Sequence, residues 1–294
     1  MMTLKLAIAA GTGLLLGLVS AGTAALAATS RPSAAPAAPS YPNHVAIAQP
    51  IYFFDDWCFA RAELEPALQH TVEVLLEALG TEDCPEASRR ASTLTLLNLS
   101  GQNLSDLRPL ATFPLLQELV LSHNQVSDIT PLSNLTQLTR LILDANQVSN
   151  LSPLEKLSRL RFLSAPNNQI DTLTPLGTLE NLQVVNLGHN QIVDLDPLAT
   201  LENLEQLMLN HNQISAIAPL ASLDALTTLD LSANTVRDLT PLSRLSQLEV
   251  LNLTGNPVTQ IAPLRQLPNL REVYLYNTPV EGRACPNPDA LCFF

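Results

Sequence analysis

Three histidines stand at matching places in the sequence, and imidazole is the side chain best suited to bind a metal or to sense pH near neutrality. His189 and His211 lie 22 residues apart, and His123 precedes the same Asn-Gln pair as they do. One interpretation is therefore a metal site or a pH-sensing pair. The other interpretation, which we favour, is that the histidines occupy an exposed and variable position of the repeat. We therefore expect neither a metal nor a cofactor. The residues at the equivalent positions are Ala145, Asn167 and Gly255.

The sequence contains no phosphate-binding Gly-rich loop, no HExxH zinc motif and no Gly-x-Ser-x-Gly nucleophile turn. It also lacks a paired Cys and His constellation. Asp55, Asp56 and His70 near the amino terminus are the candidates for an unrecognised catalytic or metal site. Such a site in the terminal caps is the alternative to our expectation of a protein without enzymatic activity.

A repeat with a period of 22 residues must position these side chains. Its most regular residue is an Asn, which gives Asn124, Asn146, Asn168, Asn190, Asn212, Asn234 and Asn256. Gln102 and Thr278 hold the same place in the two atypical end repeats. A Leu-x-Leu pattern comes before most of these Asn residues, and a Pro-Leu pair follows, as at Pro131.

Each part of the repeat has a physical interpretation. Leu-x-Leu predicts a short strand with two buried side chains, and because one 22-residue unit cannot bury them alone, successive coils must stack into one parallel sheet. The Asn amide both donates and accepts, so it can satisfy backbone groups of its own coil and of a neighbouring coil. The Pro suits the start of a short helical or turn segment on the outer side.

One coil departs from this pattern. Ala165 takes the place of an inward Leu, and Pro166 has no backbone N–H. We therefore expect this coil to be the weak point of the stack, with one hydrogen-bond donor missing from the ladder between strands.

The repeat resembles the leucine-rich repeat family, in the bacterial 22-residue form known from internalins. The resemblance extends from Leu94 to about Val280. The expected fold is an α/β repeat solenoid that forms a horseshoe or arc. One parallel sheet lines its concave side, short 3-10 or turn segments form the outer side, and a helical cap closes the amino-terminal end.

The chain divides into five segments. Residues 1–27 are typical of a signal peptide, with Lys5, an apolar run and a small-x-small site that ends at Ala27. An Ala- and Pro-rich tether follows at 28–50, a Cys-containing helical cap at 51–93, about nine coils at 94–280 and a Cys-containing cap at 281–294. A signal that is retained as a membrane anchor is the alternative to cleavage.

The four cysteines lie in the two caps. An even number favours disulfides in an exported chain. Cys58 and Cys84 are separated from Cys285 and Cys292 by about nine coils, so only pairing within each cap is geometrically reasonable. The same separation argues against a zinc site made of all four thiolates.

The charge of the chain excludes some partners. There are 15 basic and 27 acidic residues, and removing 1–27 takes away one base and leaves a net charge of −13. Nucleic acid and an anionic membrane surface are therefore unsuitable partners. Only an uncleaved signal would attach the protein to a membrane.

The outward positions of the strands are the ones that the repeat leaves free to vary. An apolar patch with a polar rim is predicted there, and two tyrosines could form a second anchor near the carboxyl-terminal cap. The candidate binding residues are Val120, Arg140, Ile142, Phe162, Val184, Gln206, Met208, Tyr274 and Tyr276. The alternative is that such residues merely favour strands.

These observations predict an exported, non-enzymatic binding module, either periplasmic or secreted. Its partner is expected to be a protein, with a glycan as the second choice. The sequence does not set the oligomeric state.

Overall fold

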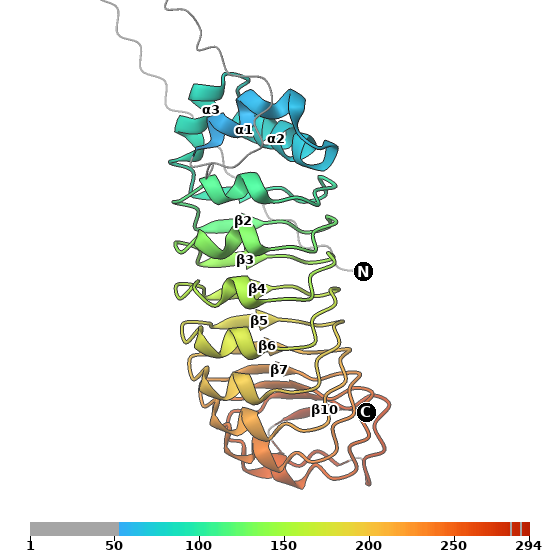
Figure 1. Ribbon diagram of the computed structural model, residues 1–294. Helices are drawn as coiled ribbons and strands as arrows, with labels where there is room; N and C mark the ends of the chain where they lie inside the picture. Colours follow the sequence, from blue (N-terminus) through green and yellow to red (C-terminus); the bar gives the residue numbers. More distant parts are fainter. Residues whose placement is uncertain (1–52, 283, 289) are drawn as a thin grey trace, which may run out of the picture. The chain divides into compact units, whose positions relative to one another are not determined.

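The computed structural model describes residues 53–282, 284–288 and 290–294, which belong to one compact unit. In this unit a group of helices is followed by a stack of similar coils (Figure 1). The predicted signal at 1–27 and the predicted tether at 28–50 lie outside the described residues.

The first helices are α1 (Phe54–Ala60), α2 (Pro66–Leu79) and α3 (Cys84–Ala91), with a 3-10 turn at Arg61–Glu63 between the first two. Helix α2 begins at Pro66, whose missing N–H costs nothing in a first turn, and ends at Gly80 with a φ of 69°. Asp83 is the residue directly before helix α3, and its carboxylate accepts the backbone N–H of Glu86 at 2.8 Å. Local capping therefore sets the ends of these helices.

One parallel sheet contains all the strands of the described residues, in the order β1 to β10. The strands are β1 (Leu96–Asn98), β2 (Glu118–Val120), β3 (Arg140–Ile142), β4 (Phe162–Ser164), β5 (Val184–Asn186), β6 (Gln206–Met208), β7 (Thr228–Asp230), β8 (Val250–Asn252), β9 (Glu272–Tyr274) and β10 (Leu291–Phe293). Neighbouring strands from β1 to β9 pair residues 22 positions apart, as in Leu119 with Leu141. The last pair breaks this period, because Leu291 lies opposite Glu272.

Each coil from β1 to β8 crosses from its strand to a short 3-10 segment on the opposite side. In the described part of the chain these segments are Arg108–Thr112, Thr130–Asn134, Ser152–Leu154, Thr174–Thr178, Asp196–Thr200, Ala218–Ser222, Thr240–Arg244 and Ala262–Gln266. Every one has a Pro in its first turn, as the position of Pro in the repeat predicts. Between strand and 3-10 segment the repeat leucines are fully buried and form one continuous core.

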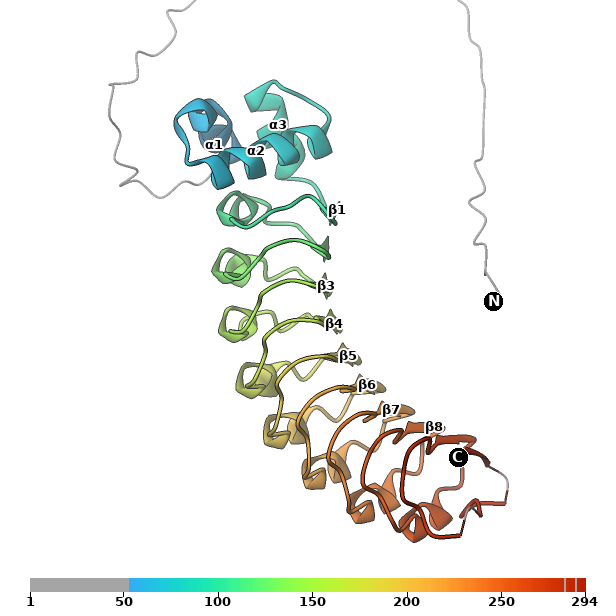
Figure 2. The ribbon, with the colours of Figure 1, turned by 90° about the vertical axis from the view of Figure 1, so that its right-hand side faces the viewer.

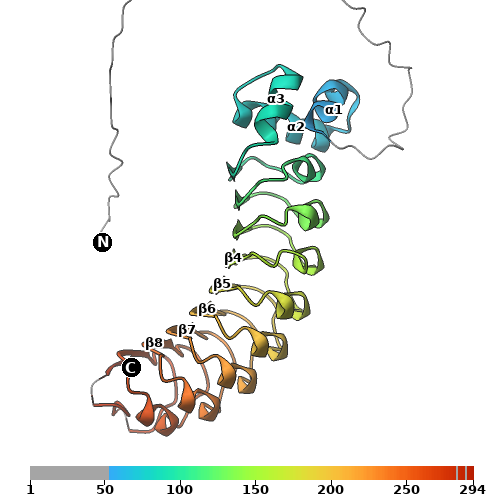
Figure 3. The same cartoon turned by 90° about the vertical axis from the view of Figure 1, so that its left-hand side faces the viewer.

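The stack bends toward its sheet. Figures 2 and 3 show the strands on the inner side of the curve and the 3-10 segments on the outer side. The parallel sheet on the concave side and the 3-10 segments outside are the expected fold.

The helices close the amino-terminal end of the core. Nε2 of His70 donates to the carbonyl oxygen of Gln102 at 2.6 Å, and Oγ1 of Thr71 donates to the carbonyl oxygen of Asp106 at 2.7 Å. Phe113 replaces a repeat Leu and meets Phe54 of α1 edge to face, with ring centroids 5.8 Å apart. Helices thus supply the contacts that a preceding coil would make.

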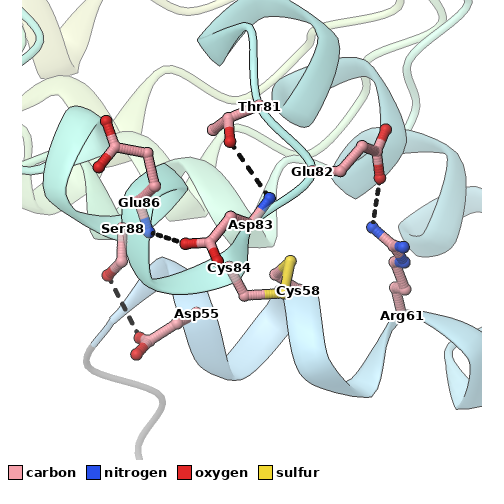
Figure 4. The surroundings of a disulfide bond; sticks show 9 residues. All are labelled: Asp55, Cys58, Arg61, Thr81, Glu82, Asp83, Cys84, Glu86 and Ser88. Carbon is pink, nitrogen blue, oxygen red and sulfur yellow. Dashed lines mark hydrogen bonds and ion pairs between the residues drawn. A yellow bond between two sulfur atoms is a disulfide. The ribbon is translucent and has the colours of Figure 1, made fainter.

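One disulfide lies at each end of the described unit. Cys58 of α1 is joined to Cys84 at the start of α3, and Cys285 is joined to Cys292 of β10. These are the pairs expected from the sequence. Around the first bond, Arg61 forms an ion pair with Glu82 at 2.8 Å and Ser88 donates to Asp55 at 3.2 Å (Figure 4).

The expectation that Pro166 removes a donor from the ladder is wrong. At several equivalent positions the backbone N–H bonds the side chain two residues earlier, as Gly188 does with Asn186 and Ser232 does with Asp230, and it is not a donor of the ladder between strands. Pro166 keeps the bond that the ladder does use, because its carbonyl accepts the N–H of Ala145 at 2.9 Å. A Pro is therefore compatible with this position.

Candidate binding face

The concave face is made by alternate residues of the strands. The middle residue of each strand in β1–β9 is buried, while the first and third are mostly half-buried or exposed. The residue two places after the strand continues this alternation. We call these three sites in each coil the concave positions, and all nine candidate binding residues occupy them.

In the first half of the sheet the apolar concave side chains form a stepped path. The register places Val120 opposite Ile142 and Phe162 opposite Val184, but it places Ile142 opposite Ser164. The path therefore changes row between β3 and β4, and again before Met208 on β6. The five apolar candidates lie on the neighbouring strands β2 to β6, and the register sets the steps between rows.

Arg140 and Phe162 form a pair at the middle of this path. The guanidinium carbon of Arg140 lies 3.7 Å from the centroid of the Phe162 ring. Such a contact contributes about 0.5 to 2 kcal/mol, depending on how far it is removed from water. Phe162 is therefore a half-covered ring with a cation on one face. Beside it, Ser164 donates to Asp144 at 2.7 Å.

The second half of the face is polar and acidic. Asp230 accepts the backbone N–H and the hydroxyl of Ser232 at 2.8 and 2.6 Å, and the amide of Asn252 at 3.2 Å. The hydroxyl of Tyr274 donates to Glu272 at 2.6 Å. This hydrogen bond, with some burial, raises the pKa of Tyr274.

An aromatic residue that sequence reasoning missed belongs to this end of the face. The ring of Phe293 on β10 stacks on Tyr274, with centroids 4.8 Å apart and planes 11° apart. Tyr276 is 45% exposed and lines a cavity of about 210 Å³ together with Phe294. The signal was the short apolar run of the last four residues, "LCFF", which fits a strand although it breaks the period.

The Asn ladder runs beside the concave face and holds the strand ends. Nδ2 of Asn146 donates to the carbonyls of Leu143 and Leu121, both at 2.9 Å, and its Oδ1 accepts the N–H of Val126 at 3.0 Å. The same three bonds recur at Asn124, Asn168, Asn190, Asn212, Asn234 and Asn256. Each amide serves its own coil and the coil before it, so the ladder is scaffold.

The residue before each ladder position has a left-handed backbone. Its φ lies between 53° and 72° throughout the nine repeat coils of the described chain, and the occupants are Gly101, His123, Ala145, Asn167, His189, His211, Ala233, Gly255 and Asn277. Gly, Asn and His are enriched in this conformation. The backbone thus accounts for the histidines, although His189 and His211 do stack, with ring centroids 4.1 Å apart.

The cap residues proposed for the alternative site lie on different helices, with Asp55 and Asp56 on α1 and His70 on α2. Asp55 on α1 accepts a bond from Ser88 on α3, whereas His70 on α2 bonds the first coil. Among the described residues, no group of three or more His, Cys, Asp or Glu side chains is arranged to hold a metal ion.

The family model for leucine-rich repeats, in its two-copy form, matches residues 92–134, 114–156, 158–200, 202–244 and 246–282. The chain belongs to the leucine-rich repeat family. These matches cover the coils that carry the concave positions of β1–β9, so the candidate face lies on the family's own repeat.

Comparison with solved structures shows that the repeats of this chain are of the internalin-like type. Internalin C2 of Listeria monocytogenes is 32% identical over 72% of this chain and 93% of its own, with a TM-score of 0.65. Internalin InlF of the same organism is 33% identical over 69% of this chain, with a TM-score of 0.67. A leucine-rich repeat protein of Leptospira interrogans is 26% identical over 71% of this chain, with a TM-score of 0.67.

The chain spans 61% of the InlF structure and 57% of the Leptospira structure, so it matches only part of each of these longer relatives. No curated protein matches the chain.

Proposed function

We propose that this leucine-rich repeat protein is an exported binding module that holds a protein partner on its concave face, without catalysis. The observation that carries the proposal is the stepped apolar path from Val120 to Met208, which crosses five neighbouring strands at positions that the scaffold does not require to be apolar. An apolar centre with a polar rim is the usual composition of a protein interface.

The Arg140 and Phe162 pair supports a protein partner. Aromatic residues and Arg contribute most to binding at protein interfaces, and they do so near the centre of the buried area. Here they are held together before any partner binds, so less side-chain freedom is lost on binding.

A related structure is in line with this proposal. The leucine-rich repeat ectodomain of the plant receptor kinase GASSHO1/SCHENGEN3 from Arabidopsis thaliana is 25% identical to this chain, with a TM-score of 0.58. That structure is a complex with CASPARIAN STRIP INTEGRITY FACTOR 2. We extend the role of binding to the present chain.

Two features support export to the periplasm or the medium. Both disulfides need an oxidising compartment. The signal predicted at 1–27 would direct the chain there. None of the helices that the structure describes is both long enough and apolar enough to cross a bilayer.

The test is partner capture by Phe162→Ala. Crosslinking and mass spectrometry in the native periplasm or culture medium would first identify the partner. The variant is expected to weaken binding by about 2 kcal/mol or more, because it removes a central ring and frees Arg140.

The control is Val193→Ala, which truncates an exposed apolar side chain away from the strands. It should bind like the wild type, and both variants should unfold at nearly the wild-type temperature. Equal capture by Phe162→Ala and the wild type would show that the partner binds elsewhere.

A further inference from the structure

We propose that the carboxyl-terminal end of the concave face binds a cationic side chain of the partner, a guanidinium or an ammonium. The site is the corner formed by Glu272, Tyr274, Tyr276 and Phe293, called the aromatic corner below. This inference rests on the proposed function, because it names the chemistry of the partner at one end of the same face.

The rings of Tyr274 and Phe293 stack on each other, so each covers one face of the other, and the pair is called the platform below. They stand opposite each other on β9 and β10, and β10 is the last strand of the sheet in the described residues. Among the described residues, no coil covers the sheet beyond Phe293. Leu291, two residues earlier on the same side of β10, is 64% exposed, so within the described chain this end of the face is accessible.

A carboxylate is held beside the platform. Oε2 of Glu272 accepts the hydroxyl of Tyr274 at 2.6 Å, which orients the carboxylate next to the ring. A carboxylate has about four acceptor positions, so one hydrogen bond leaves room for more. An aromatic face next to a carboxylate is the environment that suits a guanidinium or an ammonium, through the ring quadrupole and charge-assisted hydrogen bonds.

The corner has no cation of its own at the concave positions. In β6–β10 of the described chain the charged concave side chains are Asp230 and Glu272, both acidic. Asp230 already accepts three hydrogen bonds from Ser232 and Asn252. Arg271, next to Glu272 in the sequence, lies 3.3 Å from Glu249 in an ion pair.

The aromatic residue in the first half of the face, Phe162, differs from the aromatic corner in having a cation of its own. Phe162 carries the guanidinium of Arg140 over its ring. Tyr274 and Phe293 have stacked rings with a carboxylate beside them, but no cation over either ring among the contacts of the described residues. A partner that supplies this cation would give the second half of the face the pair that the first half already contains.

The test uses small probes, so that it does not depend on the identity of the partner. N-acetyl-arginine methylamide is titrated into the whole protein with ¹³C-labelled Tyr and Phe rings, and the neutral isostere N-acetyl-citrulline methylamide is titrated in parallel. The arginine probe should give a saturable shift of the Tyr274 and Phe293 ring signals at millimolar concentration, and the citrulline probe should not. Equal shifts with both probes, or a shift that never saturates, would overturn the inference.

Variants locate the site. Phe293→Leu should weaken binding of the arginine probe by about 2- to 30-fold, the range expected for loss of a cation–aromatic contact. Glu272→Gln should weaken it by up to about 5-fold, the range expected for loss of an exposed ion pair. Tyr274→Phe keeps the ring and leaves the carboxylate free to bind the probe, so it should bind within about 2-fold of the wild type. Arg140→Gln lies in the other half of the face and should not change binding of this probe. Unchanged affinity in both Glu272→Gln and Phe293→Leu, with thermal unfolding as in the wild type, would refute the aromatic corner.

The probe also separates this inference from the proposed function. A protein whose partner capture depends on Phe162, but which does not bind the arginine probe, retains the binding face and refutes the corner. A protein that binds the probe at Glu272, but captures its partner equally well without Phe162, supports the corner and refutes the central patch.

Discussion

The ladder Asn shows how much one residue type contributes when it can both donate and accept. At the ends of the stack the equivalent residues make fewer bonds. Gln102 is exposed, and its amide reaches only Ser100 in its own coil, at 3.4 Å. The hydroxyl of Thr278 donates to the carbonyl of Leu275 in its own coil at 2.6 Å, and in the described residues it accepts no N–H from the coil before. Only Asn in this position links two coils.

Asn190→Ala is therefore expected to destabilise the protein by about 1 to 3 kcal/mol, because it leaves the carbonyls of Ala165 and Leu187 and the N–H of Ile170 without their partner. Chemical denaturation of the purified protein measures this. Gln102→Ala is the matched control at the solenoid end and should change the free energy of unfolding far less. Similar losses in the two variants would contradict the role of the ladder.

The two ends of the repeat stack are closed by different elements. At the amino-terminal end α1 and α2 pack on the first coil, and the Cys58–Cys84 bond ties α1 to α3 across 26 residues. At the carboxyl-terminal end a short loop and β10 continue the sheet, and Cys285–Cys292 spans only 7 residues. Both elements cover the core, but the disulfide at the amino-terminal end closes a longer loop of chain than the one at the carboxyl-terminal end.

Removal of Cys58–Cys84 by a double change to Ala should therefore destabilise more than removal of Cys285–Cys292. Loop-closure entropy gives about 3.5 kcal/mol for the longer loop and about 2.4 kcal/mol for the shorter one. Thermal unfolding of the two double variants measures the difference. A greater loss from the second bond would mean that strain or packing at β10, and not loop length, decides the effect.

At the scale of the whole molecule, the protein is an acidic solenoid with one face free to vary. Its net charge of −12 favours a partner with basic groups, and it agrees with the acidic second half of the concave face. If the protein is exported as proposed, this charge acts on partners outside the cytoplasm.

The exported chain is expected to begin near Ala28, directly after the small-x-small site that ends at Ala27. Amino-terminal sequencing of the protein from the periplasm or medium checks this. An intact Met1 on membrane-bound material would instead mean that the segment is retained as an anchor.

Much of the fold was determined by the sequence alone, because each coil contacts mainly its neighbours and a 22-residue spacing therefore sets the same contacts repeatedly. The buried leucines, the Asn ladder, the Pro-initiated outer segments and the disulfide pairs all follow from local patterns of this kind. The nine candidate binding residues also follow, since strand alternation alone brings them to the concave positions.

The tertiary structure decided the rest, where the period fails or where side chains of neighbouring coils meet. Strand β10 joins the sheet 19 residues after β9 instead of 22. The period of the repeat therefore does not predict that Phe293 lies opposite Tyr274. The contact of Arg140 with Phe162, and of Phe293 with Tyr274, depends on which way each side chain turns across the sheet. Spacing along the chain carries no information about that direction, because it arises only when two coils are stacked.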